Sequence, residues 1–236
     1  MSSSALKLLA ASGATDSATY VDDLFSTFLF TGNGSDQTIT NGVDLSGEGG
    51  LVWTKSRSTS SSHELFDTAR GVNQVMYSDG SNDSDTLSNS LKAFNSGGFT
   101  MGNNVAANVN NRSGCSWTFR KAPGFFDIVK YTGTGSARDI AHNLGSVPGM
   151  VIIKSLDRTY KWIVSHRSLA NLSEYLSLSE NSAKSTDANV FGSSSDSHTA
   201  TTFHVGTDSY GNQSGDEYIA YLFAHDAQDF GTGSDE

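Results

Sequence analysis

The sequence has little of several features that mark common classes of protein. Only 17% of its residues are charged, and 25 acidic against 15 basic side chains give a net charge of -10 without a cluster of Lys and Arg. Proteins that hold phosphate backbones need a positive surface, so we exclude nucleic acid as the partner. Cys115 is the only cysteine, which excludes an internal disulfide and a metal site made of thiolates.

Long apolar runs are also missing, and none approaches the roughly 18 residues that a membrane-spanning helix needs. An apolar cluster near the N-terminus, residues 5–11, contains Leu6, Leu8 and Leu9. Lys7 lies inside this cluster, whereas a signal peptide carries its positive charge before a longer apolar stretch. We therefore predict no membrane insertion, and we expect residues 1–23 to form a docking arm that binds another protein through these leucines.

Short apolar segments bounded by Gly, Asn, Asp and Ser dominate the rest of the chain, which is the pattern of strands and turns. The segments that we expect to form strands are residues 25–30, 51–54, 116–119, 128–131, 150–153, 162–164 and 218–223. Only residues 86–94 and 168–176 have a spacing that would suit a few helical turns. The sequence therefore predicts an all-β protein.

An internal repeat is the most informative pattern in the sequence. The run Phe-Ser-Thr-Phe-Leu-Phe-Thr-Gly-Asn-Gly-Ser at residues 25–35 is echoed by Phe-Asp-Ile-Val-Lys-Tyr-Thr-Gly-Thr-Gly-Ser at residues 126–136. Further matches follow in the same order: 50–56 with 149–155, 98–102 with 202–206, and 116–119 with 220–223. Each copy has the size of a small β-sandwich, about 100 residues. We predict two tandem, internally duplicated β-sandwich modules, residues 24–123 and 124–236.

The repeated Thr-Gly-x-Gly-Ser run predicts a tight turn after a strand, because glycine supplies the positive φ that such turns need. A phosphate-binding glycine loop would lead into a helix, and both copies lead into strand-like sequence instead. Between the copies, near Pro123, there is no flexible linker. We expect the modules to be rigidly related, which favours a scaffold over a hinge-bending enzyme.

Motifs of catalytic or metal sites are weak. His63-Glu64 resembles half of a zinc-protease motif, but Asp67 stands where the second histidine should be, and the segment has the pattern of a strand. The other histidines are scattered, and only the fold could bring together a pair such as His198 and His204. We predict no enzyme, no cofactor and no metal site. Calcium at the oxygen-rich residues 79–85 stays open beside the preferred interpretation of a solvated acidic loop.

Aromatic residues next to Asn and Asp are a second way to bind a ligand, since lectin-like β-sandwiches hold sugars by ring stacking and hydrogen bonds. The candidates for such a surface are Tyr160, Trp162, Tyr175 and Tyr210. Aromatic residues in strands are more often part of a core, so glycan binding is the alternative interpretation.

Several runs resemble a family of virion proteins from tailed bacteriophages of marine bacteria, notably cyanophages. They are Ser-Trp-Thr-Phe-Arg-Lys-Ala-Pro-Gly-Phe-Phe-Asp at residues 116–127, the segment 142–154 and the segment 218–225, with residues 5–12, 20–26 and 44–53. The resemblance covers nearly the whole chain. It implies a structural component of the particle, described as tail-fibre-like or simply structural, and it supplies no catalytic residues.

These observations predict a non-enzymatic structural protein on the exterior of a tailed phage particle, made in the host cytoplasm. It would be a capsid decoration (knob) protein or a tail-fibre or tail-associated protein, anchored by its N-terminal arm. Its expected partners are other virion proteins and further copies of itself in a homo-oligomer. The alternative is a lectin-like module that recognises host-surface glycans.

Overall fold

The computed structural model describes residues 19–225, and nearly all of their regular structure is β-strand. The predicted all-β class is confirmed. A short helix, α1 (Val21–Leu24), leads directly into the first strand and buries Leu24. We call residues 25–120 the first unit and residues 126–224 the second unit.

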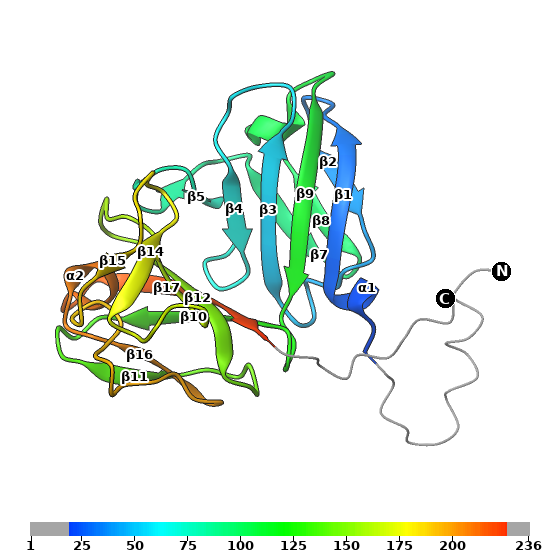
Figure 1. Ribbon diagram of the computed structural model, residues 1–236. Helices are drawn as coiled ribbons and strands as arrows, with labels where there is room; N and C mark the ends of the chain where they lie inside the picture. The colour runs from blue at the N-terminus through cyan, green and yellow to red at the C-terminus, as the bar shows by residue number, and fades with distance from the viewer. Residues whose placement is uncertain (1–18, 226–236) are drawn as a thin grey trace, which may run out of the picture.

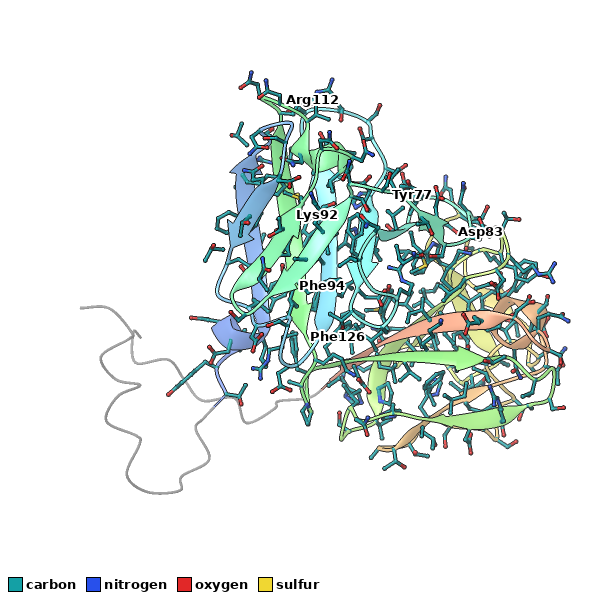
Figure 2. All side chains as sticks on the ribbon, turned by 180° about the vertical axis from the view of Figure 1, so that it is seen from behind. Tyr77, Asp83, Lys92, Phe94, Arg112 and Phe126 are labelled. Atoms are coloured by element: carbon teal, nitrogen blue, oxygen red, sulfur yellow. The ribbon has the colours of Figure 1, made fainter. Side chains whose placement is uncertain are left out.

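The first unit contains nine strands and a short 3-10 helix, η2 (Ala106–Asn108). The strands are β1 (Phe25–Thr31), β2 (Gln37–Thr40), β3 (Gly50–Ser56), β4 (Glu64–Asp67), β5 (Gln74–Tyr77), β6 (Asp85–Thr86), β7 (Leu91–Asn95), β8 (Gly98–Met101) and β9 (Ser113–Arg120). They form a six-stranded antiparallel sheet, β1-β9-β3-β4-β5-β6, and a three-stranded sheet, β2-β8-β7. Figure 1 shows the smaller sheet behind the larger one, and the reverse view in Figure 2 brings it to the front with Lys92 and Phe94.

The second unit has the same arrangement with one strand fewer. Its strands are β10 (Phe126–Thr132), β11 (Arg138–Ala141), β12 (Pro148–Ser155), β13 (Ile163–His166), β14 (Glu174–Ser177), β15 (Ser185–Thr186), β16 (Thr202–Val205) and β17 (Glu217–Ala224), with the helix α2 (Ser209–Asn212) before the last. The sheets are β10-β17-β12-β13-β14-β15 and β11-β16. The two large sheets therefore have the same strand order, each strand matched by one at the same place. That the units arose by duplication stays a prediction.

One buried asparagine holds the repeated glycine turn in each unit. The side chain of Asn108 donates to the carbonyls of Ser35 and Gly102 at 2.7 and 2.8 Å. Asn212 makes the corresponding bonds to Ser136 and Gly206 at 2.7 and 2.6 Å. In both turns the amide Oδ1 also accepts a backbone N–H of the turn. Since buried polar groups need partners, these three bonds fix the conformation of each turn.

Glycine is required in these turns for a steric reason. A Cβ on Gly32 would lie 2.5 Å from the Val109 carbonyl oxygen, and a Cβ on Gly133 would lie 2.2 Å from that of Gln213. The predicted tight turn is therefore present in both units, with its backbone packed against the helical segment before the last strand.

Each unit has its own hydrophobic core between its two sheets. In the first unit the core includes Val52, Phe66 and Phe99, and in the second it includes Val151, Ile163 and Phe203. The interiors differ at one matched strand pair. Thr54 faces the buried Glu64 in the first unit, whereas Ile153 faces Ile163 in the second.

A third core lies between the units, where the outer faces of the two six-stranded sheets pack together. It joins the side chains of Leu51, Leu65 and Met76 to a set from the second unit: Phe126, Ile128, Ile152, Trp162, Val164, Ile219 and Tyr221. The strands of the two large sheets run in different directions across this contact (Figure 1). The sequence pattern predicted two cores, one in each module, and gave no sign of this third one.

The two segments that suited helical turns are extended instead. Residues 86–94 include the end of β6 and most of β7, and residues 168–176 form a turn that leads into β14. Leu87, Leu91 and Phe94 have helix-like spacing, but they all pack on the first-unit core from an extended chain. The expectation of helix there is wrong because tertiary packing, rather than a helical repeat, set the spacing.

Candidate functional site

The outer face of the first-unit sheet is only partly covered by the second unit. Antiparallel pairing places Thr27, Trp117 and Trp53 side by side across β1, β9 and β3, and it places Leu29 beside Cys115 and Lys55 in the next row. Leu29 is 59% exposed, which is high for a leucine in the middle of a strand. We call the uncovered part of this sheet, formed by Thr27, Leu29, Trp53, Lys55, His63 and Trp117, the open face.

Three rings form a cluster on the open face. Trp53 Nε1 donates to His63 Nδ1 at 2.9 Å, and the two rings meet edge to face with centroids 5.9 Å apart. His63 lies nearly parallel to Trp117, with centroids 6.3 Å apart. Burial lowers the pKa of His63, although Asp79 acts in the opposite direction. The imidazole is therefore neutral at pH 7, with Nδ1 as acceptor and the proton on Nε2.

The corresponding face of the second unit is covered except at Lys130, which matches Leu29 and is exposed. Trp162, which precedes β13 as His63 precedes β4, is fully buried and donates from Nε1 to the Tyr77 carbonyl at 2.9 Å. Lys154 matches Lys55 and is fully buried, and burial lowers its pKa to about 8, with Asp83 opposing. The cover is the first-unit segment that carries Tyr77 and Asp83 (Figure 2).

A buried polar network crosses the junction between the units. The Asp67 carboxylate accepts from Arg70 Nε at 2.5 Å and from the Tyr221 hydroxyl at 2.7 Å. The side chains of Asp67 and Arg70 are 0% and 2% exposed. Arg70 also donates to the Leu65 and Gln74 carbonyls, and burial raises the pKa of Tyr221. All three groups thus have partners, as buried charges require.

Beside this network lies a polar hollow of about 320 Å³, lined by Arg70, Gln74, Ser84, Lys130, Leu156, Asp157 and Glu217. Its charged groups bind one another, since Lys130 pairs with Glu217 at 2.7 Å and Asp157 accepts the Glu217 N–H at 2.6 Å. The hollow therefore belongs to the polar rim of the contact between the two units, where the lining groups bind one another.

The four predicted sugar-binding residues do not form one exposed surface. Trp162 and Tyr175 are 0% and 6% exposed, so the expectation that they lie on a surface is wrong: Trp162 belongs to the junction core and Tyr175 to the second-unit core. Tyr160 and Tyr210 are half-buried and meet edge to face at 5.6 Å. Lys161 Nζ lies 4.7 Å from the Tyr210 ring centroid and 5.1 Å from that of Tyr175. The rings of Tyr175 and Tyr210 therefore bind the ammonium group of Lys161.

The second unit does bring His198 and His204 together. His198 Nδ1 accepts the His204 backbone N–H at 3.2 Å, and His198 Nε2 lies 3.1 Å from the Ser165 hydroxyl. Burial lowers the pKa of His198 to about 4, with further contributions from His204 and His142. Because Nδ1 is an acceptor, the proton lies on Nε2 and the imidazole donates to Ser165. In this tautomer His198 does not act as a base toward the serine.

The residues of the two weak metal-binding motifs, His63-Glu64 and the loop 79–85, make separate contacts with other parts of the chain. His63 and Glu64 lie on opposite sides of the sheet, and Glu64 Oε2 accepts the Ala106 N–H at 2.9 Å inside the first unit. In the loop 79–85, Asp79 accepts the His63 backbone N–H, and Asp83 lies near Lys154. Within residues 19–225, no group of three or more His, Cys, Asp or Glu side chains is placed to hold a metal ion. The docking residues Leu6, Leu8 and Leu9 lie outside the described residues.

Sequence comparison agrees with the extent of the fold. Residues 21–232, which span both units, match a family described as a domain of unknown function, DUF7483. The chain belongs to the DUF7483 family. No curated protein and no solved structure matches it. The DUF7483 assignment thus comes without a ligand, a partner or an activity. Of the helices in the described part, none is both long and apolar enough to cross a membrane.

Of the residues that distinguish the two outer faces, Trp162 alone was among the predicted site residues, and it was predicted there as a surface residue. A signal for Trp53 is present in the alternation Leu51, Trp53, Lys55, which puts all three on one side of a strand. Nothing local indicates that Trp53 and Trp117 would meet, or that Asp67 and Tyr221 would bond across 154 positions.

Proposed function

We propose that this protein is a non-enzymatic structural component on the exterior of a tailed phage particle, either a capsid decoration protein or a tail-associated protein. The resemblance of residues 116–127, 142–154 and 218–225 to phage virion proteins supports the class. The observation that carries the structural role is the junction core, because it joins two β-units through a buried apolar contact and a buried hydrogen bond from Tyr221 to Asp67.

A particle surface needs parts that keep their shape without disulfides, and the junction supplies this property. Separate domains joined by a small polar interface move relative to one another by default. Here Leu51, Leu65 and Met76 are each at most 1% exposed beneath the second unit, so hinge motion would expose a continuous apolar core. The two units therefore suit a rigid spacer or knob.

Attachment to the particle is assigned to the N-terminal arm. Its leucines form an apolar cluster that precedes α1, and α1 contacts both β1 and β9. An arm that enters the body at the edge of a six-stranded sheet can bind a neighbouring protein while both units stay folded. A symmetric particle would present many copies of such a site, so a homo-oligomer is the expected assembly.

Glycan binding is less well supported by the described residues. Two of the four candidate aromatic residues are buried, and Lys161 occupies the ring face of Tyr210. We therefore keep a glycan-binding role as the competing outcome of the tests.

Localisation in intact particles tests the proposal directly. Cryo-electron microscopy of the phage that encodes this chain should show both β-units as ordered density on the head or the tail, with matching peptides in purified particles. Absence of the protein from purified particles would overturn the proposal. A glycan array of the purified protein tests the alternative, with Tyr210→Ala and Tyr160→Ala as the informative variants and His166→Ala as a surface control.

A further inference from the structure

We propose that residues 5–11 of the chain cover the open face of the first unit in the free protein. The proposal does not depend on the role in a phage particle, and it names what covers the open face. It rests on the composition of the face, its continuity with the junction core, and the place where the described chain begins.

The composition of the open face is that of a contact surface. Leu29 exposes 59% of its surface, and the rings of Trp53 and Trp117 are half-buried beside it. Tryptophan with exposed aliphatic neighbours is typical of the central part of protein contacts, whereas single exposed apolar residues need no explanation. In the second unit most of the matched positions are buried, including Trp162, Lys154 and Ile219, and the residue that matches Leu29 is the exposed, charged Lys130.

The open face also continues an interface that is already formed. Trp53 and Phe119 pack on the junction core with one side. Register places Phe25, Thr27 and Leu29 along the same side of β1, next to Phe119, Trp117 and Cys115 of β9. An apolar segment that lies along β1 and β9 would therefore extend the junction core across the remaining part of the sheet.

The N-terminal segment begins close enough to reach this face. Residue 19 precedes α1, and α1 leads directly into Phe25 at the start of β1. Leu29 lies four residues further along the strand, about 14 Å away at the usual rise per residue. The ten residue-to-residue steps from Leu9 to residue 19 can span up to about 35 Å. The tether thus has ample length, and it holds the segment at an effective concentration in the millimolar range, which favours it over a second copy of the protein.

The rings of the open face are arranged less well for a sugar. His63 lies nearly parallel to Trp117 with ring centroids 6.3 Å apart, and it takes the Trp53 N–H that would bind a hydroxyl group. What stays accessible is mainly apolar surface next to Leu29. This surface matches the three leucines of residues 5–11 better than a polar ligand.

Disulfide trapping tests the proposal in the full chain. In a Cys115→Ala background, Leu8→Cys is combined with Leu29→Cys on the open face. The matched control combines Leu8→Cys with Lys92→Cys, which is exposed on the opposite sheet (Figure 2). After mild oxidation of dilute protein, peptide mapping should show an intrachain disulfide at least about fivefold more abundant for Leu29→Cys than for Lys92→Cys, as a docked segment requires.

A second measurement uses the native tryptophans. Replacing Leu6, Leu8 and Leu9 by Asp should increase acrylamide quenching, because two of the three tryptophans lie on the open face. Replacing Ser2, Ser3 and Ser4 by Asp adds the same charge and should leave quenching unchanged. Equal disulfide yields at Leu29 and Lys92, or equal quenching in both triple variants, would overturn the proposal. So would disulfides formed only between chains, which would assign the face to a second copy, or protection of the tryptophans only by added polysaccharide.

Discussion

The two units place the same six-stranded sheet in two different surroundings. In the second unit most of the outer face is buried, with Trp162, Tyr221 and Lys154 each at most 1% exposed, and Lys130 on the edge strand is exposed. In the first unit the same face is half covered, and Leu29, Trp53 and Trp117 remain accessible in part. Strand order and alternation are therefore compatible with either state, and the neighbouring unit determines which residues become core.

Their interiors differ in a second way. The first unit buries an acid, since Glu64 is 4% exposed and burial raises its pKa to about 7, against the opposing bond from Ala106. The second unit has Ile163 at the matched position, and its half-buried His198, in the loop before β16, has a pKa that burial lowers to about 4. The same fold thus holds an acidic group, Glu64, in the first unit and a basic group, His198, at an unmatched position in the second.

Removing the buried carboxylate at the junction should have the largest effect on the stability of the protein. Asp67→Ala leaves the Arg70 guanidinium buried without its carboxylate, so we expect a loss of up to about 5 kcal/mol in the free energy of unfolding. The matched position in the second unit is His166, which is half-buried and accepts one backbone N–H. His166→Ala should cost about 1 kcal/mol or less. Urea unfolding measures both, and similar costs would contradict the stabilising role of the junction network.

Truncating one ring on each outer face compares the covered with the open state. Trp162→Ala should cost about 4 kcal/mol, because it leaves a cavity in the junction core. His63→Ala should cost about 1 kcal/mol, since its ring is half-buried and its main loss is the bond from Trp53. The difference between the two values in thermal or urea unfolding checks this prediction. Equal values would contradict the difference in burial between the Trp162 and His63 rings.

The buried ionisable groups should give the two units opposite dependences on pH. Because the folded pKa of Glu64 is raised from 4.5 to about 7, its contribution to stability is present below pH 4.5 and is lost as the pH rises through about 7. The folded pKa of His198 is lowered from 6.5 to about 4, so its contribution is present above pH 6.5 and is lost as the pH falls through about 4. Each shift corresponds to about 3 kcal/mol.

Two variants separate these contributions. Unfolding free energies measured across this pH range should rise with pH more steeply in Glu64→Gln than in the wild type. In His198→Asn the rise should be weaker than in the wild type. If either variant keeps the wild-type profile, the group that it removes does not titrate with the shifted pKa that its burial implies.

Replacing the buried turn asparagine should cost the same free energy of unfolding in each unit. Asn108→Ala and Asn212→Ala each remove a buried amide with three hydrogen bonds to one glycine turn, and each should cost about 2 kcal/mol. Asn103→Ala, at an exposed position of the first unit, should change stability by less than about 0.5 kcal/mol. Unequal effects of Asn108 and Asn212 would show that the two turns are not equivalent.

Local sequence was sufficient for the strands and turns but not for the contacts between units. The seven predicted strand segments lie in or directly beside observed strands, because alternation and glycine turns are local properties. Trp162 is a candidate for a sugar-binding surface on sequence grounds because it is an aromatic residue near Asn and Asp, and only the position of the first unit shows that it is buried. Cores that form between two sheet faces depend on residues far apart in the chain, which a single sequence does not reveal.

Urea unfolding followed separately in each unit tests the central claim most directly. Hydrogen exchange read by mass spectrometry can follow peptides from β3 and β9 of the first unit and from β12 and β17 of the second. Because the junction core and the Asp67 network are shared, both sets of peptides should lose protection at the same urea concentration. Loss of protection in one unit while the other stays folded would contradict the account of two units joined through one buried interface.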